Sequence, residues 1–112
     1  MATIFHITKR EEWELAKQEG VYRAPSLATE GFIHCSTAEQ VVRTANRLFA
    51  GQMGLVLLEI DTEQVKPEIR YENCEGGQEQ FPHIYGPLDV KSVSRVLTFE
   101  PGADGRFAMP SI

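Results

Sequence analysis

Apolar residues along the chain follow two periods, one typical of strands and the other typical of helices. Short runs rich in β-branched and aromatic residues predict strands at 3–7, 31–35, 69–72, 81–85 and 93–99. The run at 55–60 is apolar at nearly every position and lacks the alternation of a half-exposed strand. We therefore expect 55–60 to form the central strand, covered on both faces.

Two further stretches repeat apolar residues at helical spacing, each after a polar start signal. Thr8 and Glu11 match a capping box, in which a hydroxyl and a carboxylate satisfy each other's backbone amides, and the helix that follows should end at Gly20. Ser36 and Glu39 repeat the capping box. They predict a second helix, ending near residue 51, with an apolar face made of Val41, Val42, Ala45, Leu48 and Phe49.

The order of these elements indicates the fold class. Both predicted helices lie in the N-terminal half among many strands, which is typical of an α+β domain. Residues 21–29 and the Pro/Gly-rich tail 100–112 are expected to be irregular. A length of 112 residues fits one domain that spans 1–112.

Composition and charge limit the classes of binding partner that we expect. Hydrophobic residues make up 42% of the chain and charged residues 24%, as in a globular protein rather than a disordered one. The 11 basic residues are outnumbered by 16 acidic ones, and no basic run exceeds Lys9–Arg10. Because nucleic-acid binders carry a basic face, we expect no DNA or bulk RNA partner. A small anionic ligand needs only a local positive site.

The cysteines and the absence of long apolar runs indicate the compartment. Cys35 and Cys74 are far apart, and no signal peptide precedes the first predicted strand. No apolar run approaches the roughly 20 residues that span a bilayer. We expect a cytoplasmic protein, without a membrane partner, in which both thiols are free.

The most informative motif occurs twice. His6 to Glu11 and His34 to Glu39 share the pattern His-x-(Thr/Ser)-x-x-Glu, which places each histidine two residues before a predicted helix start, at Thr8 or Ser36. Free backbone N–H groups and the positive end of the helix dipole make such a position an anion site. The same field favours a neutral imidazole. The alternative stays open that both motifs are only structural.

Strand alternation adds a third histidine. His83 shares a strand face with Phe81 and Tyr85, as His34 does with Ser36. Imidazole, hydroxyl and aromatic groups together are typical of a nucleoside pocket, although the aromatic residues alone are equally typical of a core. We expect the three histidines to border one cavity.

Other chemistry is not indicated by the sequence. Zinc sites usually contain a close ligand pair, but the only near pair is His34 with Cys35, whose side chains should point to opposite faces of a strand, so we expect no metal site. Cys35 should be buried and structural rather than nucleophilic. Phosphate-binding glycine loops and the Gly-x-Ser-x-Gly elbow are absent.

Two stretches of the chain, Glu30–Ser36 and Phe81–Leu88, form specific motifs. They occur together with Phe5–Thr8, Trp13, Gly20–Tyr22, Ser26–Leu27, Ala45–Arg47, Gly105–Phe107 and Pro110. In these residues the chain resembles, over nearly its whole length, a bacterial and plant family catalogued as domain of unknown function 952.

That family is similar in fold, at a distant level, to ADP-ribosyltransferases, which grip NAD between a split, mostly antiparallel pair of small sheets. The resemblance implies NAD as the cofactor and a ribose-binding role for His6, with His34 and Ser36 at the polar position of the second strand. The strand at 81–85 would be the one that usually carries a catalytic glutamate. This chain has no glutamate there, and Gln80 precedes the motif.

Two hypotheses of different classes follow. The first is a small enzyme that handles NAD or a related nucleotide by ADP-ribosyl-type transfer. Its catalytic residues would be His6, His34 and His83, and its ligand-binding residues would be Thr8, Tyr22, Ser36, Phe81 and Tyr85. The alternative is a non-catalytic module that binds a small metabolite. A protein-binding domain is a third reading, and it predicts an exposed apolar patch.

Overall fold

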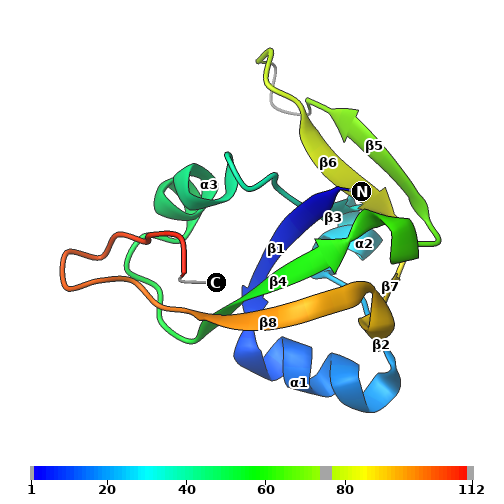
Figure 1. The fold of residues 1–112 in the computed structure, drawn as a ribbon, viewed down its shortest axis with the longest axis horizontal. Coiled ribbons are helices and arrows are strands. Elements are labelled where there is room, and N and C mark those ends of the chain that lie inside the picture. The colour runs from blue at the N-terminus through cyan, green and yellow to red at the C-terminus, as the bar shows by residue number, and fades with distance from the viewer. Residues whose placement is uncertain (1, 74–76, 111–112) are drawn as a thin grey trace.

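A three-stranded antiparallel sheet is the centre of the computed structural model, which describes residues 2–73 and 77–110 (Figure 1). Its strands run in the order β1 (Thr3–Lys9), β4 (Leu55–Asp61) and β8 (Val93–Phe99). The prediction of a central strand covered on both faces is confirmed, because five of the seven β4 residues are at most 1% exposed.

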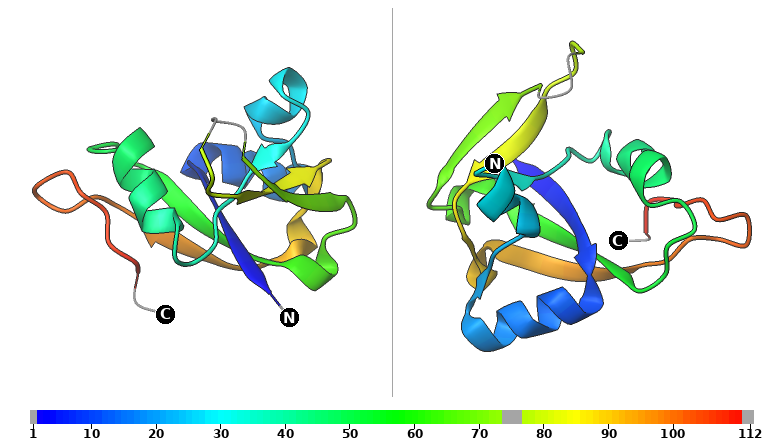
Figure 2. Two further views of the ribbon diagram at one scale, coloured as in Figure 1. Left: turned by 90° about the horizontal axis from the view of Figure 1, so that it is seen from above. Right: turned by 180° about the vertical axis from the view of Figure 1, so that it is seen from behind.

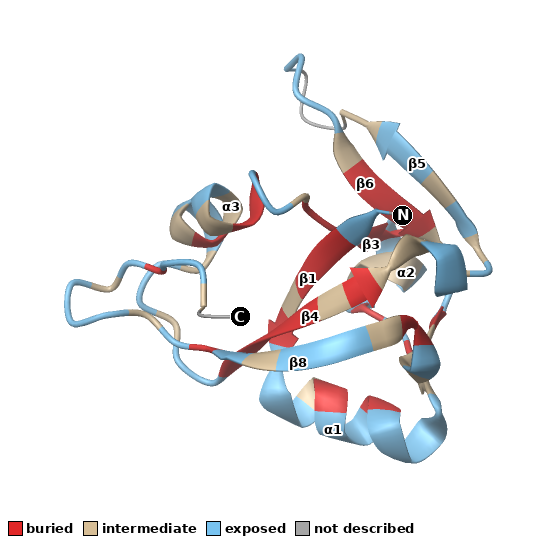
Figure 3. Ribbon diagram, in the orientation of Figure 1, coloured by how far each residue is buried: buried red, intermediate tan, exposed pale blue. Residues whose placement is uncertain are grey.

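The two faces of β4 belong to two separate apolar clusters. Val56, Leu58 and Ile60 pack in a cluster with Trp13 of helix α1 (Arg10–Glu19). Leu55 and Leu57 pack in the other, which contains the buried residues of helix α3 (Val41–Leu48). Figure 3 shows the result: β4 is buried, while the outer side of α1 faces solvent. The strand is apolar at 55–58 and at Ile60 because each face has its own covering helix.

A second three-stranded antiparallel sheet has the order β3 (Ile33–His34), β6 (Phe81–Tyr85) and β5 (Glu68–Glu72). Figure 2 shows β5 and β6 extending away from the first sheet as an arm. Strands β2 (Val21–Tyr22) and β7 (Leu88–Asp89) form a short pair, and single turns of 3-10 helix occupy Thr62–Gln64 and Val90–Ser92. The α+β class and the mostly antiparallel sheets agree with the prediction.

The number of helices and the character of 21–29 were predicted incorrectly. Three α-helices occur in the described residues, because a short helix α2 (Pro25–Thr29) lies in the stretch expected to be irregular. Pro25 occupies the first helical position, where its missing N–H costs nothing. The tail from residue 100 to 110 has no helix or strand, as predicted, although Phe107 is buried and stacks on Phe99.

Neither predicted capping box forms. Helix α1 has Lys9 at its N-cap, and α3 has Gln40, in both cases without a side-chain cap. Thr8 remains in β1, and Ser36 instead pairs with the backbone of Phe5. Tertiary hydrogen bonds therefore take the hydroxyl and the backbone that the boxes would use. The predicted end at Gly20 is confirmed, with φ of 83° in the left-handed region that suits glycine.

Candidate functional site

The two larger sheets meet at one point and then diverge. Phe5 of β1 and Ser36 exchange two backbone hydrogen bonds of 2.7 and 2.8 Å. In a continuing antiparallel ladder, the next bonded pair would be Ile7 and His34. Instead, the carbonyl oxygen of His34 lies 2.5 Å from Nδ1 of the His6 ring. The imidazole of His6 thus occupies the fork at which the sheets separate.

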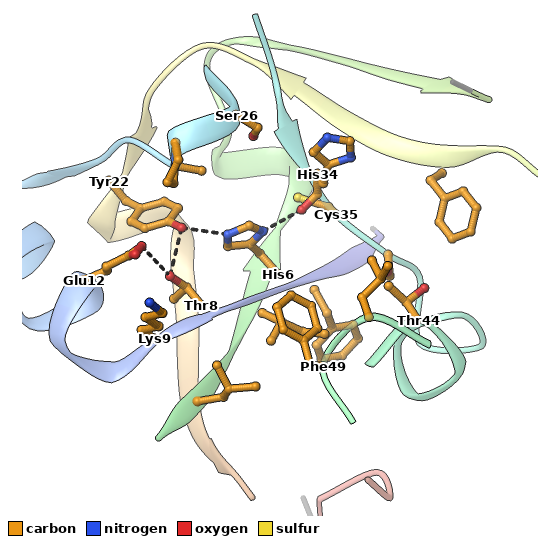
Figure 4. A pocket seen from close by; sticks show the side chains of 18 of the residues that line it. His6, Thr8, Lys9, Glu12, Tyr22, Ser26, His34, Cys35, Thr44 and Phe49 are labelled. Atoms are coloured by element: carbon orange, nitrogen blue, oxygen red, sulfur yellow. Dashed lines mark hydrogen bonds between the residues drawn. The ribbon is translucent and has the colours of Figure 1, made fainter. Parts of the chain in front are cut away.

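His6 is held through both ring nitrogens (Figure 4). Because the carbonyl of His34 can only accept, Nδ1 carries the proton, and Nε2 lies 2.7 Å from the hydroxyl of Tyr22. That hydroxyl is also 3.0 Å from Oγ1 of Thr8, which in turn donates to Glu12 over 3.4 Å. Burial lowers the pKa of His6 to about 4 and raises the pKa of Tyr22 to about 12. The ring is therefore neutral at pH 7.

A cavity of about 390 Å³ opens beside this fork. All three histidines border it, His6 from β1, His34 from β3 and His83 from β6, so the expectation that they share one cavity is met. The apolar part of the wall consists of Phe5, Ile7, Ala24, Pro25, Cys35, Leu48, Phe49, Leu55 and Phe81. The polar part adds Thr8, Lys9, Glu12, Tyr22, Ser26, Ser36, Thr44, Arg47 and Gln52.

The divergence leaves part of β1 with an open edge. Phe5 directs its N–H and carbonyl towards Ser36, so alternation directs those of Ile7 towards the same side, into the fork. Arg10 donates to Gly54 on the opposite side, as this alternation requires. Within the described residues, no backbone group bonds to Ile7 from the fork side. The cavity wall thus presents one backbone donor and one backbone acceptor next to His6.

The outer face of β3, β6 and β5 carries a second set of polar contacts. His83 lies directly opposite His34, and its ring stacks on Phe32 with the ring centroids 4.1 Å apart. Its Nδ1 lies 3.0 Å from Oε1 of Glu72, which also accepts a hydrogen bond from the hydroxyl of Tyr85. These two hydrogen bonds, that of Tyr85 first, lower the pKa of Glu72 and keep it ionised. The opposite face of this sheet packs into the core.

Most of the predicted site residues border the cavity. Thr8, Tyr22, Ser36 and Phe81 line it together with the histidines. Tyr22 is 2% exposed, so it presents its hydroxyl rather than an open ring face. Tyr85 is not part of the lining and instead contacts Glu72.

The predicted anion sites at helix starts are wrong. His6 lies four residues before α1 and His34 lies seven residues before α3, so neither imidazole stands at a helix N-cap. Positive charge reaches the cavity through Lys9 and Arg47 instead. Glu12, in the first turn of α1, adds a negative charge at the Thr8 end.

Cys35 behaves as predicted. It is 4% exposed in the apolar core, and burial raises the pKa of its thiol, so the nucleophilic thiolate is disfavoured. Cys74 lies outside the described residues. Within 2–73 and 77–110, no three potential ligands among His, Cys, Asp and Glu lie together in a way that would hold a metal ion. In the same residues, no helix has the length and hydropathy needed to cross a bilayer.

Sequence reasoning missed the position of Glu72. The alternation of Ile69, Arg70, Tyr71 and Glu72 places Arg70 and Glu72 on one face, and this signal was available. The register that sets Arg70 opposite His83 was not available, and this register brings the carboxylate of Glu72 to the imidazole.

Comparisons with known proteins agree with the resemblance. A family model described as protein of unknown function (DUF952) matches residues 7–96. The chain is similar to protein CC0527 from Caulobacter crescentus, with a sequence identity of 37% to the chain in its crystal structure. The match covers 95% of this chain and 93% of that chain, and the TM-score is 0.85. The solution NMR structure of CC0527 is 38% identical over 95% and 91% of the two chains, with a TM-score of 0.83. No curated protein matches the chain.

Proposed function

This chain belongs to the family described as protein of unknown function (DUF952), and we propose that it binds NAD or a related nucleotide in the cavity at the fork of its sheets, as a small enzyme of ADP-ribosyl-transfer type. The observation that carries the proposal is the open backbone edge at Ile7, which lies next to the neutral, buried imidazole of His6. This edge offers one directed donor and one directed acceptor in an otherwise largely apolar cavity, which is typical of a site for a nucleoside.

The size of the cavity supports a nucleoside-sized occupant. Ligand pockets commonly enclose about 300–1,000 Å³, and about 390 Å³ lies at the low end of that range. The nicotinamide and its ribose would fill the fork, and the rest of the dinucleotide would lie across the rim. The paired donor and acceptor of Ile7 match the acceptor and donor of a planar carboxamide.

The charged side chains around the cavity suggest how the proposed ligand is oriented. Figure 4 shows Glu12 and Thr8 on one side of His6, and Thr44 and Phe49 on the other. Arg47 also belongs to α3 and borders the cavity, whereas at the Thr8 end the carboxylate of Glu12 offsets the positive charge of Lys9. We therefore place the phosphate end of the ligand towards Arg47. A local positive site of this kind is compatible with a net charge of −5 on the whole chain.

The test is to incubate the protein with NAD while following nicotinamide release and the melting temperature. We expect NAD to raise the melting temperature and nicotinamide to appear. Arg47→Gln should weaken binding about 10-fold or more, since one charge-assisted hydrogen bond is lost. The matched variant Arg95→Gln, on β8 and outside the cavity lining, should bind as the wild type does. No response to NAD, ADP-ribose or nicotinamide mononucleotide would contradict the proposal.

A second candidate function is a non-catalytic module that binds a small metabolite. It is favoured by one observation, namely that the strand Phe81–Tyr85 brings no carboxylate of its own to the cavity. The two candidates differ in the fate of the ligand. A ligand that is captured from a metabolite mixture and recovered unchanged after long incubation supports the binding module, whereas turnover supports the enzyme.

A further inference from the structure

Neighbouring side chains hold the ring of His83 in place from several sides. His83 is 1% exposed, and its ring lies nearly parallel to that of Phe32, with an interplanar angle of 17°. The edge of His34 approaches it at a centroid distance of 5.2 Å. Its Nδ1 is bonded to the carboxylate of Glu72. Position, plane and one nitrogen of the ring are therefore all fixed by neighbours.

The other ring nitrogen of His83, Nε2, has no hydrogen-bond partner among residues 2–73 and 77–110, and His83 borders the cavity. Glu72 is ionised and can only accept, so Nδ1 of His83 carries a proton, and in the neutral tautomer that results Nε2 carries the lone pair. No protein group in 2–73 and 77–110 bonds to this Nε2, although no fully buried side-chain nitrogen or oxygen there lacks a partner. Nε2 is therefore not fully buried, in a residue that lines the cavity.

The carboxylate of Glu72 is itself positioned by two neighbours. The hydroxyl of Tyr85 donates to the same oxygen as His83 does, and the guanidinium of Arg70 lies 4.4 Å above the ring of Tyr85. A carboxylate that fixes the tautomer of an imidazole at the border of a ligand site, and leaves its second nitrogen without a protein partner, is the arrangement of a general base. The carboxylate also stabilises the imidazolium that forms when the base takes a proton.

We propose that His83 is the general base of the cavity and that Glu72 is the residue that positions it. This inference rests on the proposed function and assigns to the site the carboxylate that 81–85 lacks. In the hydrolytic form of the reaction, the oxygen of water attacks C1′ of the nicotinamide ribose, and one proton of that water moves to Nε2 of His83. The bond from C1′ to nicotinamide breaks, and its electron pair neutralises the pyridinium. The products are ADP-ribose, nicotinamide and one proton.

The pair is tested without any ligand by the tautomers of the imidazoles. The chain has three histidines, so a long-range ¹H–¹⁵N spectrum of the labelled protein contains three imidazole systems. We expect the proton of His83 on Nδ1 at neutral pH. A proton on Nε2 would overturn the proposal whatever the protein binds.

The catalytic role is tested by variants that preserve the hydrogen bonds. In His83→Asn, the amide can still donate to Glu72, but no base faces the cavity, so NAD should still raise the melting temperature while nicotinamide release falls about 100-fold or more. Glu72→Gln keeps an acceptor without the charge and should lower kcat about 10-fold or more with little change in KM. Glu68→Gln is the matched control, because Glu68 lies on the same strand and pairs with Arg70.

The outcomes separate this inference from the proposed function. NAD that is cleaved by His83→Asn at the wild-type rate overturns the base while the function stands. A wild-type protein that neither binds nor cleaves NAD overturns the function and the reaction written above, and the spectrum still decides whether His83 and Glu72 form the pair.

Discussion

Two buried histidines border the same cavity, and they differ in how many of their ring nitrogens the protein already occupies. His6 is bonded through both, to the carbonyl of His34 and to the hydroxyl of Tyr22. His83 is bonded through one, to Glu72. A ring with both nitrogens bonded shapes the cavity and fixes its hydrogen bonds, whereas a ring with one open nitrogen can exchange a proton with a ligand. Stability should therefore depend on His6, and chemistry on His83.

The largest loss of stability is expected when the ring of His6 is removed. His6→Ala removes a buried ring and leaves the carbonyl of His34 and the hydroxyl of Tyr22 without that partner, which should lower the free energy of unfolding by about 2–5 kcal/mol. Urea unfolding measures the loss. In the matched variant His34→Ala, the deleted side chain is 44% exposed and, among residues 2–73 and 77–110, hydrogen-bonds only to Glu30, so the loss should be much smaller. Equal losses would show that His6 is not a structural centre.

Acidification should break the same network without a mutation. The pKa of His6 is about 4 in the folded protein, below the 6.5 of an unfolded histidine, so the unfolded state binds more protons between these values. Above pH 6.5, His6 therefore contributes about 3 kcal/mol to the free energy of unfolding. This contribution is lost as the pH falls towards 4. Urea unfolding across this range measures the slope. His6→Gln should flatten it, and an unchanged slope would contradict the assignment.

The smallest change in stability is expected at Glu72, the partner of His83. Glu72→Gln keeps the shape and an acceptor for His83, and Glu72 is partly exposed on the outer face of its sheet. We expect the melting temperature to stay at the wild-type value while nicotinamide release falls. A large fall in melting temperature would place Glu72 with His6, as part of the structural network.

The sequence was sufficient where one local signal determined the outcome. The largely apolar run at 55–60 requires cover on both faces, and β4 has it. The predicted strand at 93–99 coincides with β8. The ends of helix α1 behaved differently: Gly20 decides the C-terminus by its own backbone conformation, whereas the start depends on where the hydroxyl of Thr8 bonds.

The candidate site was predictable only as a set of residue types. The repeated His-x-(Thr/Ser)-x-x-Glu pattern identified His6 and His34, yet their environments are opposite, because His6 is buried while His34 is exposed. That difference arises from the divergence of β1 and β3 after the bridge at Ser36, which joins residues far apart in the chain. The pairing of Glu72 with His83 likewise depends on the register between β5 and β6. Local patterns do not determine either contact.

The central claim is that the fork between the sheets binds a nicotinamide nucleotide, and titration of the ¹⁵N-labelled protein with NAD tests it most directly. The account predicts saturable shifts of the Ile7 amide and of the His6 and His83 imidazole signals. The amide of Val96, on the exposed part of β8, should not move. Shifts confined to residues outside the cavity, or no shifts at millimolar NAD, would contradict it.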